Sequence, residues 1–175
     1  ERLNLNRSSG INLLGESNSI IPNPSGRNWS DVALPWMSFG YNISISPLQT
    51  LMVYNAVANN GKMLKPYLVN AIMKDGKVVQ EFKTTVLRDS ICSKSTLLQL
   101  QSCLEGVVLS GTGKSMLNRF YTLAGKTGTA QVANGNKGYT DHIYQSSFAG
   151  YFPAQNPKYS CIVVIKNKPF AQKYY

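Results

Sequence analysis

The alternation of hydrophobic and polar positions predicts a first helix within SISPLQTLMVYNAVANNGK, residues 44–62. Ser46 is suited to cap the helix, Pro47 to occupy its first turn and Gly61 to end it. The apolar residues recur at the spacing of one helical face, which predicts burial of that face; they are Leu48, Leu51, Met52, Ala56 and Val57.

The next 50 residues predict a hairpin and a second helix. The stretch YLVNAIMKDGKVVQEFKTT, residues 67–85, has two runs of strand-forming residues joined by Asp75-Gly76, a strong hairpin signal. SKSTLLQLQSCLEGVVLSGTG, residues 93–113, carries apolar residues at helical spacing and runs into glycines.

Residues 1–35, rich in Asn, Ser, Gly and Pro, are predicted to form an extended segment dominated by loops.

Three strand-like segments complete the pattern. They are YTLAGKTGTAQVA (121–133), QSSFAGYFPA (145–154) and KYSCIVVIK (158–166), and turn sequences separate them. Short connections favour an antiparallel meander. Because helices precede the sheet instead of alternating with its strands, we predict a mixed α and β (α+β-like) fold in which helices pack on an antiparallel sheet.

Composition narrows the class of protein. Of the 175 residues, 43% are hydrophobic and 15% charged, which predicts one domain with a packed core. The net charge of +10 favours an anionic partner, and a lipid, a cell-wall polymer or a carboxylate substrate fits equally well. The lysines are scattered, so nucleic acid is not an expected partner. No apolar stretch reaches the roughly 20 residues that cross a bilayer.

The three cysteines, Cys92, Cys103 and Cys161, show no CxxC or His pairing that would indicate a metal site. Cys92 and Cys103 flank one predicted helix and would lie about 16 Å apart along it, too far for a disulfide. We therefore expect three buried thiols and no metal.

Two further candidates have ordinary explanations. SGTGKS, residues 110–115, resembles the end of a phosphate-binding loop, but that motif needs a glycine where Val108 stands, so a loop that ends the helix is favoured. His142 has only Asp141 beside it and is expected to be a polar loop residue instead of a general base.

The segment KTGTAQ, residues 126–131, carries the most specific chemistry. Strand alternation places Lys126 and Gly128 on one face and Thr127 and Thr129 on the other. Lysine and hydroxyl groups suit a carboxylate, and the glycine leaves room for another backbone to approach. An exposed edge strand protected by Lys and Thr would explain Lys126, Thr127 and Thr129, but not Gly128.

Lys126-Thr127-Gly128 closely resembles the third motif of the penicillin-recognising acyl-serine transferases, which follows Ser-x-x-Lys and Ser-x-Asn. GINLLGE, SFGYNISISPLQTLMVYNAVANNG, AGKTGTAQ and SSFAGYFPAQNPKYSCIVVI resemble segments of the class B penicillin-binding proteins, which are peptidoglycan transpeptidases. SSFAGYFPA is closer to the division-type branch. Asn42 departs from the family, which usually has Gly there, although Asn also tolerates positive φ.

The resemblance implies roles for the strand. Lys126 and Thr127 would be catalytic, with Lys126 setting the potential of the site, while Thr127 and Thr129 would hold a terminal carboxylate. Gly128 would give clearance, and the Thr129 N–H would form part of an oxyanion hole. The implied partners are D-Ala-D-Ala stem peptides, β-lactams and cell-wall synthesis or division proteins, without a cofactor or nucleic acid. The implied location is the extracytoplasmic face of the cytoplasmic membrane, with the anchor outside this chain.

No Ser-x-x-Lys and no Ser-x-Asn occurs in the 175 residues. We therefore expect residues 1–175 to be a partial transpeptidase domain, truncated at both ends and inactive alone. A β-lactam sensor domain and a noncatalytic module that binds carboxylates or peptides are the alternatives. A β-lactamase is disfavoured by the SPLQ helix.

Overall fold

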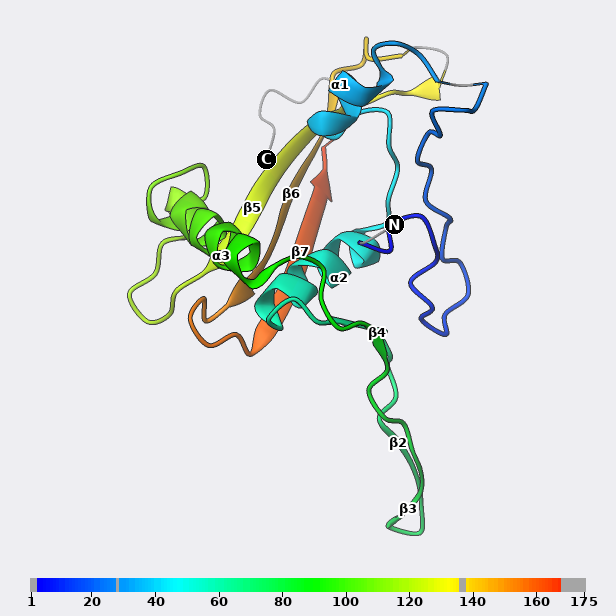
Figure 1. The fold of residues 1–175 in the computed structure, drawn as a ribbon, viewed down its shortest axis with the longest axis vertical. Coiled ribbons are helices and arrows are strands. Elements are labelled where there is room, and N and C mark those ends of the chain that lie inside the picture. Colours follow the sequence, from blue (N-terminus) through cyan, green and yellow to red (C-terminus); the bar gives the residue numbers. More distant parts are fainter. Residues whose placement is uncertain (1–2, 28, 136–137, 168–175) are drawn as a thin grey trace.

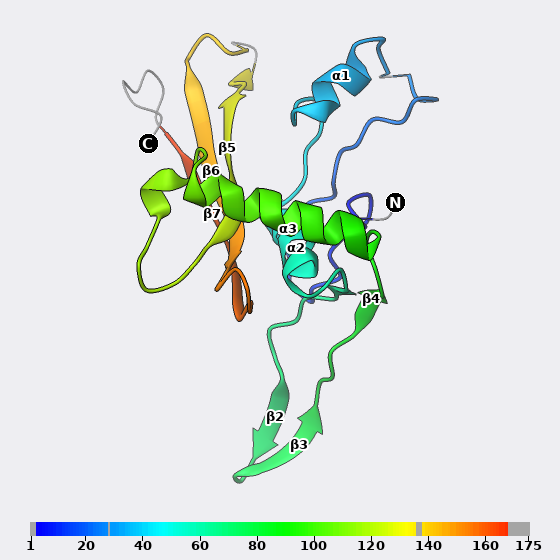
Figure 2. The same cartoon turned by 60° about the vertical axis from the view of Figure 1, so that its left-hand side comes forward.

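The computed structural model describes residues 3–27, 29–135 and 138–167 (Figure 1). A three-stranded antiparallel sheet has two helices packed against it, and a long hairpin projects away from both (Figures 1 and 2). The predicted mixed α and β class, with helices preceding a final meander, is confirmed. The C-terminal KPFAQKYY lies outside the described residues.

Helix α2 (Pro47–Ala58) begins and ends as the sequence predicts. The Ser46 hydroxyl accepts a hydrogen bond from the Gln49 N–H (3.2 Å), and the Gln49 side chain accepts one from the Ser46 N–H (2.9 Å), which forms a capping box. Gly61, at φ +86°, lies just beyond the end of the helix. The backbone there enters the left-handed region that glycine adopts without strain.

Gln49 also ties the N-terminal segment to α2. It is buried, and its side-chain amide donates to the Arg7 carbonyl (2.7 Å) and to the Ser19 hydroxyl (2.6 Å). A short bridge between Ile20 and Ser44 holds the same segment. Loop-rich residues far from α2 in sequence are thus fixed beside its first turn.

The sheet consists of β5 (Ala124–Val132), β6 (Ile143–Phe152) and β7 (Tyr159–Lys166), in that order. Strand β5 pairs only with β6 in the described sheet, so its other side is an edge. Helix α3 (Lys94–Leu109) packs on β5, and α2 packs on β6 and β7. The hydrophobic core joins the two helices to the sheet; its buried members include Ala56, Val57, Met63, Leu97, Leu104, Ala124 and Tyr151.

The projecting hairpin pairs β2 (Ala71–Lys74) with β3 (Lys77–Glu81), and Asp75 and Gly76 form its two-residue loop at φ +49° and +75°. The predicted hairpin is therefore confirmed. At its base, β1 (Met63–Leu64) pairs with β4 (Val86–Arg88), two short strands that the pattern did not indicate.

Two expectations were wrong. A short helix, α1 (Ala33–Ser38), begins inside the region expected to be loop, and only its Ala33 is buried. The three thiols are not all buried, because Cys103 is exposed and Cys92 and Cys161 are partly exposed. Cys103 lies on α3 next to buried Leu104, and a one-residue step rotates a side chain by about 100° out of the buried face.

One buried polar atom has no hydrogen-bond partner among the described residues, the hydroxyl of Tyr151. Tyr151 is 1% exposed. Burial and, to a smaller extent, the charge of Glu105 raise the pKa of Tyr151 to about 12. Burial of this hydroxyl costs desolvation energy that no hydrogen bond offsets.

We expect Tyr151→Phe to raise the free energy of unfolding by about 1–3 kcal/mol at neutral pH, because it removes an unsatisfied buried group. The raised pKa adds a pH test. The contribution of the raised pKa to the free energy of unfolding is fully present below pH about 10 and is lost as pH rises toward about 12. The phenylalanine variant should lack this part of the alkaline loss. Urea unfolding from pH 7 upward measures both effects, and a destabilised variant would contradict the assignment.

Candidate active site

Strand β5 places the KTGTAQ segment at the middle of the sheet's edge strand. Lys126 and Thr129 are exposed, while Thr127 and Gly128 are partly exposed. The register pairs Lys126 with Ala149, Thr127 with Phe148 and Gly128 with Ser147. Because directly paired residues share a face, Lys126 and Gly128 lie on one face and Thr127 and Thr129 on the other, as predicted.

The Thr127 hydroxyl is held by a residue that the sequence did not indicate. It lies 2.7 Å from the Thr112 hydroxyl, in the turn that follows α3. The Lys126 ammonium donates to the Thr127 carbonyl (2.8 Å) and lies 3.4 Å from the Thr127 hydroxyl. Two hydroxyls and one ammonium therefore gather at this edge, a set of donors that suits a carboxylate.

Gly128 leaves room for a side chain of the neighbouring strand. A Cβ at this position would lie 2.7 Å from the Ser147 hydroxyl oxygen, closer than such atoms approach. The Ser147 hydroxyl borders the space that the sequence predicted for an approaching backbone. No sequence signal identified Ser147, because its importance follows only from the pairing of β5 with β6.

A cleft of about 350 Å³ lies between this face of the sheet and α2. Thr50 and Tyr54 line it from the helix, and burial raises the pKa of Tyr54. From the sheet, it is lined by Lys126, Thr127, Gly128, Gln145, Ser147, Ala149, Ile162 and Val164. The cleft therefore has a polar edge at Lys126 beside an apolar floor formed by Ala149, Ile162 and Val164.

The far end of β5 meets an aromatic cluster. The Gln131 N–H donates to the Tyr41 hydroxyl (3.3 Å), and Tyr41 makes edge contacts with Trp36 and Phe39. Asn42 adopts φ +61°, as expected of the residue that replaces the family's usual glycine. The loop before α2 is thus fixed to the candidate strand.

Neither of the other two sequence candidates forms a site of its own, although Thr112 of SGTGKS contacts Thr127. Ser110 caps the end of α3, and residues 111–116 form turns and a short 3₁₀ helix, so SGTGKS is the predicted helix-ending loop. His142 is an exposed residue just before β6. Among the described residues, no group of three or more His, Cys, Asp or Glu side chains is placed to bind a metal, and no helix is long and apolar enough to span a membrane.

The full chain, residues 1–175, matches the family model described as "Penicillin binding protein transpeptidase domain". The chain belongs to this family. It is 31% identical, over 99% of its length, to the peptidoglycan D,D-transpeptidase FtsI of Buchnera aphidicola and 30% identical, over 99% of its length, to FtsI of Escherichia coli. It covers 29% and 27% of these two relatives. The predicted resemblance to class B penicillin-binding proteins is confirmed.

Solved structures agree with the family's fold. Penicillin-binding protein 3 of Mycobacterium tuberculosis, solved in complex with aztreonam, matches with a TM-score of 0.81 and 31% identity. That match covers 96% of this chain and 38% of the mycobacterial one. Penicillin-binding protein 2B of Streptococcus pneumoniae shares the fold at a TM-score of 0.78 and 22% identity.

We expect Gly128→Ala to destabilise the protein by about 1 kcal/mol, because the added methyl group forces the Ser147 hydroxyl to rotate out of the space that it holds. The double variant Gly128→Ala/Ser147→Ala should recover most of this loss, which a double-mutant cycle from urea unfolding measures. Gly125→Ala is the matched control, because its Cβ would lie 2.5 Å from the Ala149 carbonyl oxygen, which Ser147→Ala does not move. Additive effects of Gly128→Ala and Ser147→Ala would refute the contact.

Proposed function

We propose that this chain is part of a peptidoglycan D,D-transpeptidase domain and supplies the strand, β5, that binds the terminal carboxylate of the donor peptide. The observation that carries the proposal is the arrangement of Lys126, Thr127 and Thr112 around one edge of β5, within a chain that matches the transpeptidase family along its whole length. Residues 1–175 are, in this proposal, a partial domain that continues at both ends.

The reaction proposed for the whole protein is acyl transfer in two steps. A serine oxygen attacks the D-Ala-D-Ala carbonyl, the terminal D-Ala leaves with a proton on its nitrogen, and an amine of a second stem peptide then displaces the serine. Thr127 and Thr129 would bind the donor's carboxylate. Lys126 would set the local potential, and the Thr129 N–H would stabilise the oxyanion.

The serine is proposed to come from a segment outside this chain, since no Ser-x-x-Lys occurs here. The cleft between α2 and the sheet suits that segment. Its floor includes Ile162 and Val164, of which Val164 is 36% exposed, and its rim carries Lys126. An amphipathic helix that packed its apolar face on this floor would bring a polar residue close to the Lys126 edge.

Two alternatives are less well supported. A β-lactam sensor domain would share the β5 motif, and a simple carboxylate-binding module would need no nucleophile. The relatives, however, include proteins named as D,D-transpeptidases, and the mycobacterial neighbour was solved with aztreonam and with ampicillin. We therefore favour a catalytic protein that β-lactams acylate.

The relatives named FtsI favour a division-type role, with partners among the proteins of cell-wall synthesis or division. The substrate is then exposed at the extracytoplasmic face of the cytoplasmic membrane, where we place this domain. The anchor belongs to the part of the protein outside residues 1–175.

In the complete protein, we expect Thr127→Val and Thr129→Val each to slow acylation by a fluorescent penicillin by about tenfold or more, because each removes a hydrogen bond to a charged group worth about 1.5–3 kcal/mol. Gel fluorescence at several drug concentrations gives the second-order rate constant. Thr85→Val, an exposed threonine near the base of the hairpin, is the control and should react normally. Normal acylation of both site variants would overturn the carboxylate role.

The 175-residue chain by itself should form no covalent adduct with the same penicillin, because it contains no Ser-x-x-Lys. Intact-mass spectrometry after prolonged incubation is the measurement. The complete protein, treated in parallel, should gain the mass of one drug molecule. An adduct on the short chain would refute the proposal that its nucleophile lies elsewhere.

A further inference from the structure

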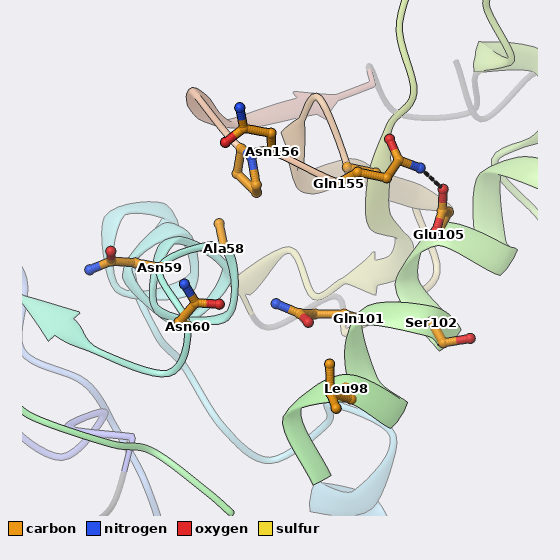
Figure 3. Close-up of a pocket in the computed structure, with 11 residues that line it drawn as sticks. Ala58, Asn59, Asn60, Leu98, Gln101, Ser102, Glu105, Gln155 and Asn156 are labelled. Carbon is orange, nitrogen blue, oxygen red and sulfur yellow. Dashed lines mark hydrogen bonds between the residues drawn. The ribbon is translucent and has the colours of Figure 1, made fainter. Parts of the chain in front are cut away.

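A second cavity, of about 490 Å³, lies away from the β5 edge (Figure 3). It is enclosed by the end of α2, one face of α3 and the turn between β6 and β7. Its volume is within the range of about 300–1,000 Å³ that is typical of small-molecule sites. The polar residues that line it are mainly amides: Asn59, Asn60, Gln101, Ser102, Glu105, Gln155 and Asn156.

Part of this lining is fixed by hydrogen bonds. The Gln101 amide donates to the Val57 carbonyl at the end of α2 (2.9 Å). Gln155 donates to Glu105, as Figure 3 shows, and accepts from the Thr122 hydroxyl. These bonds link α2, α3 and the sheet around the cavity, so its walls are preorganised.

Other lining groups remain available. Within the described part of the chain, the side chains of Asn60, Ser102 and Asn156 make no hydrogen bond with another residue. Within the same described residues, Oε2 of Glu105 accepts no hydrogen bond, since Gln155 donates to Oε1. Donors and acceptors therefore face the cavity together, which suits a ligand that both donates and accepts.

Charge restricts the class of ligand. The cavity is lined by one carboxylate and no Lys, Arg or His, and the C-terminal end of α2 adds partial negative charge, so an anion is disfavoured. The chain as a whole carries +10, which repels a cation at long range. A neutral ligand rich in hydroxyl and amide groups satisfies both conditions.

We propose that this cavity binds a neutral oligosaccharide whose sugars carry N-acetyl groups. The ligand's hydroxyls would donate to Glu105, and its acetamide groups would pair with the side-chain amides of Asn60 and Asn156. The site would deepen the proposed function, because it rests on that function for its biological ligand, a glycan strand of peptidoglycan. Thr122 lies just before β5 and, at strand spacing, about 13 Å from Lys126, so the cavity is separate from the carboxylate edge.

The test is to titrate the protein with chitotetraose, a β-1,4-linked N-acetylglucosamine tetramer, and to follow the side-chain amide signals by NMR. Signals of Asn60, Gln101 and Asn156 should shift in a saturable manner. Ser102→Phe, which fills the cavity, should weaken binding at least tenfold, and Asn156→Ala, in the exposed turn, about threefold to tenfold. Cys103→Phe, at an exposed position that lies about 100° further round α3 and does not line the cavity, should bind normally.

Failure to shift these signals, equal binding by Ser102→Phe, or equally tight binding of maltotetraose, which lacks acetamide groups, would overturn the proposal. Penicillin acylation of the complete protein is measured separately. If the complete protein is not acylated but binds the sugar, the proposed transpeptidase function is wrong and the sugar site stands. If it is acylated normally but does not bind the sugar, only the proposed sugar site is wrong.

Discussion

The close approach of β5 to β6 at Gly125 and Gly150 is the constraint on which the rest of the candidate site depends. These two glycines are directly paired, and a Cβ on either would collide with the backbone of the opposite strand. The pairing continues without a register shift from Ala124–Tyr151 to Val132–Ile143. Because side-chain direction alternates along a strand, the register at the glycine pair decides which face Lys126 occupies.

The helices support the same strand from the core side. Ala124 and Tyr151, adjacent to the glycine pair, are buried beneath α2 and α3. A slip by one residue would turn both side chains away from the core face and put Gly125 and Gly150, which have no side chain, in their place, so the core would lose apolar contacts. The capping box at Ser46 and Gln49 fixes where α2 begins, and thereby the helical side of the cleft.

The sequence was sufficient for features that depend on local chemistry. Ser46, Pro47 and Gly61 bound α2, and Asp75-Gly76 forces the hairpin loop, because each acts on its own backbone. Thr112 and Ser147 could not be found in this way, since their importance arises from contacts 15 and 19 residues away. The exposure of Cys103 was missed because the expectation rested on residue type alone, whereas the position next to buried Leu104 turns the thiol out of the buried face.

The hydrogen bonds at Thr127 also determine how the edge can receive a carboxylate. A hydroxyl has one proton, so when Thr127 donates that proton to a bound carboxylate, Thr112 must be the donor in the bond between the two threonines. The Lys126 ammonium, which only donates, is anchored on the Thr127 carbonyl and cannot take that proton. Both neighbours therefore leave the Thr127 proton available, and because they already hold its surroundings in place, a ligand binds without the entropic cost of ordering them.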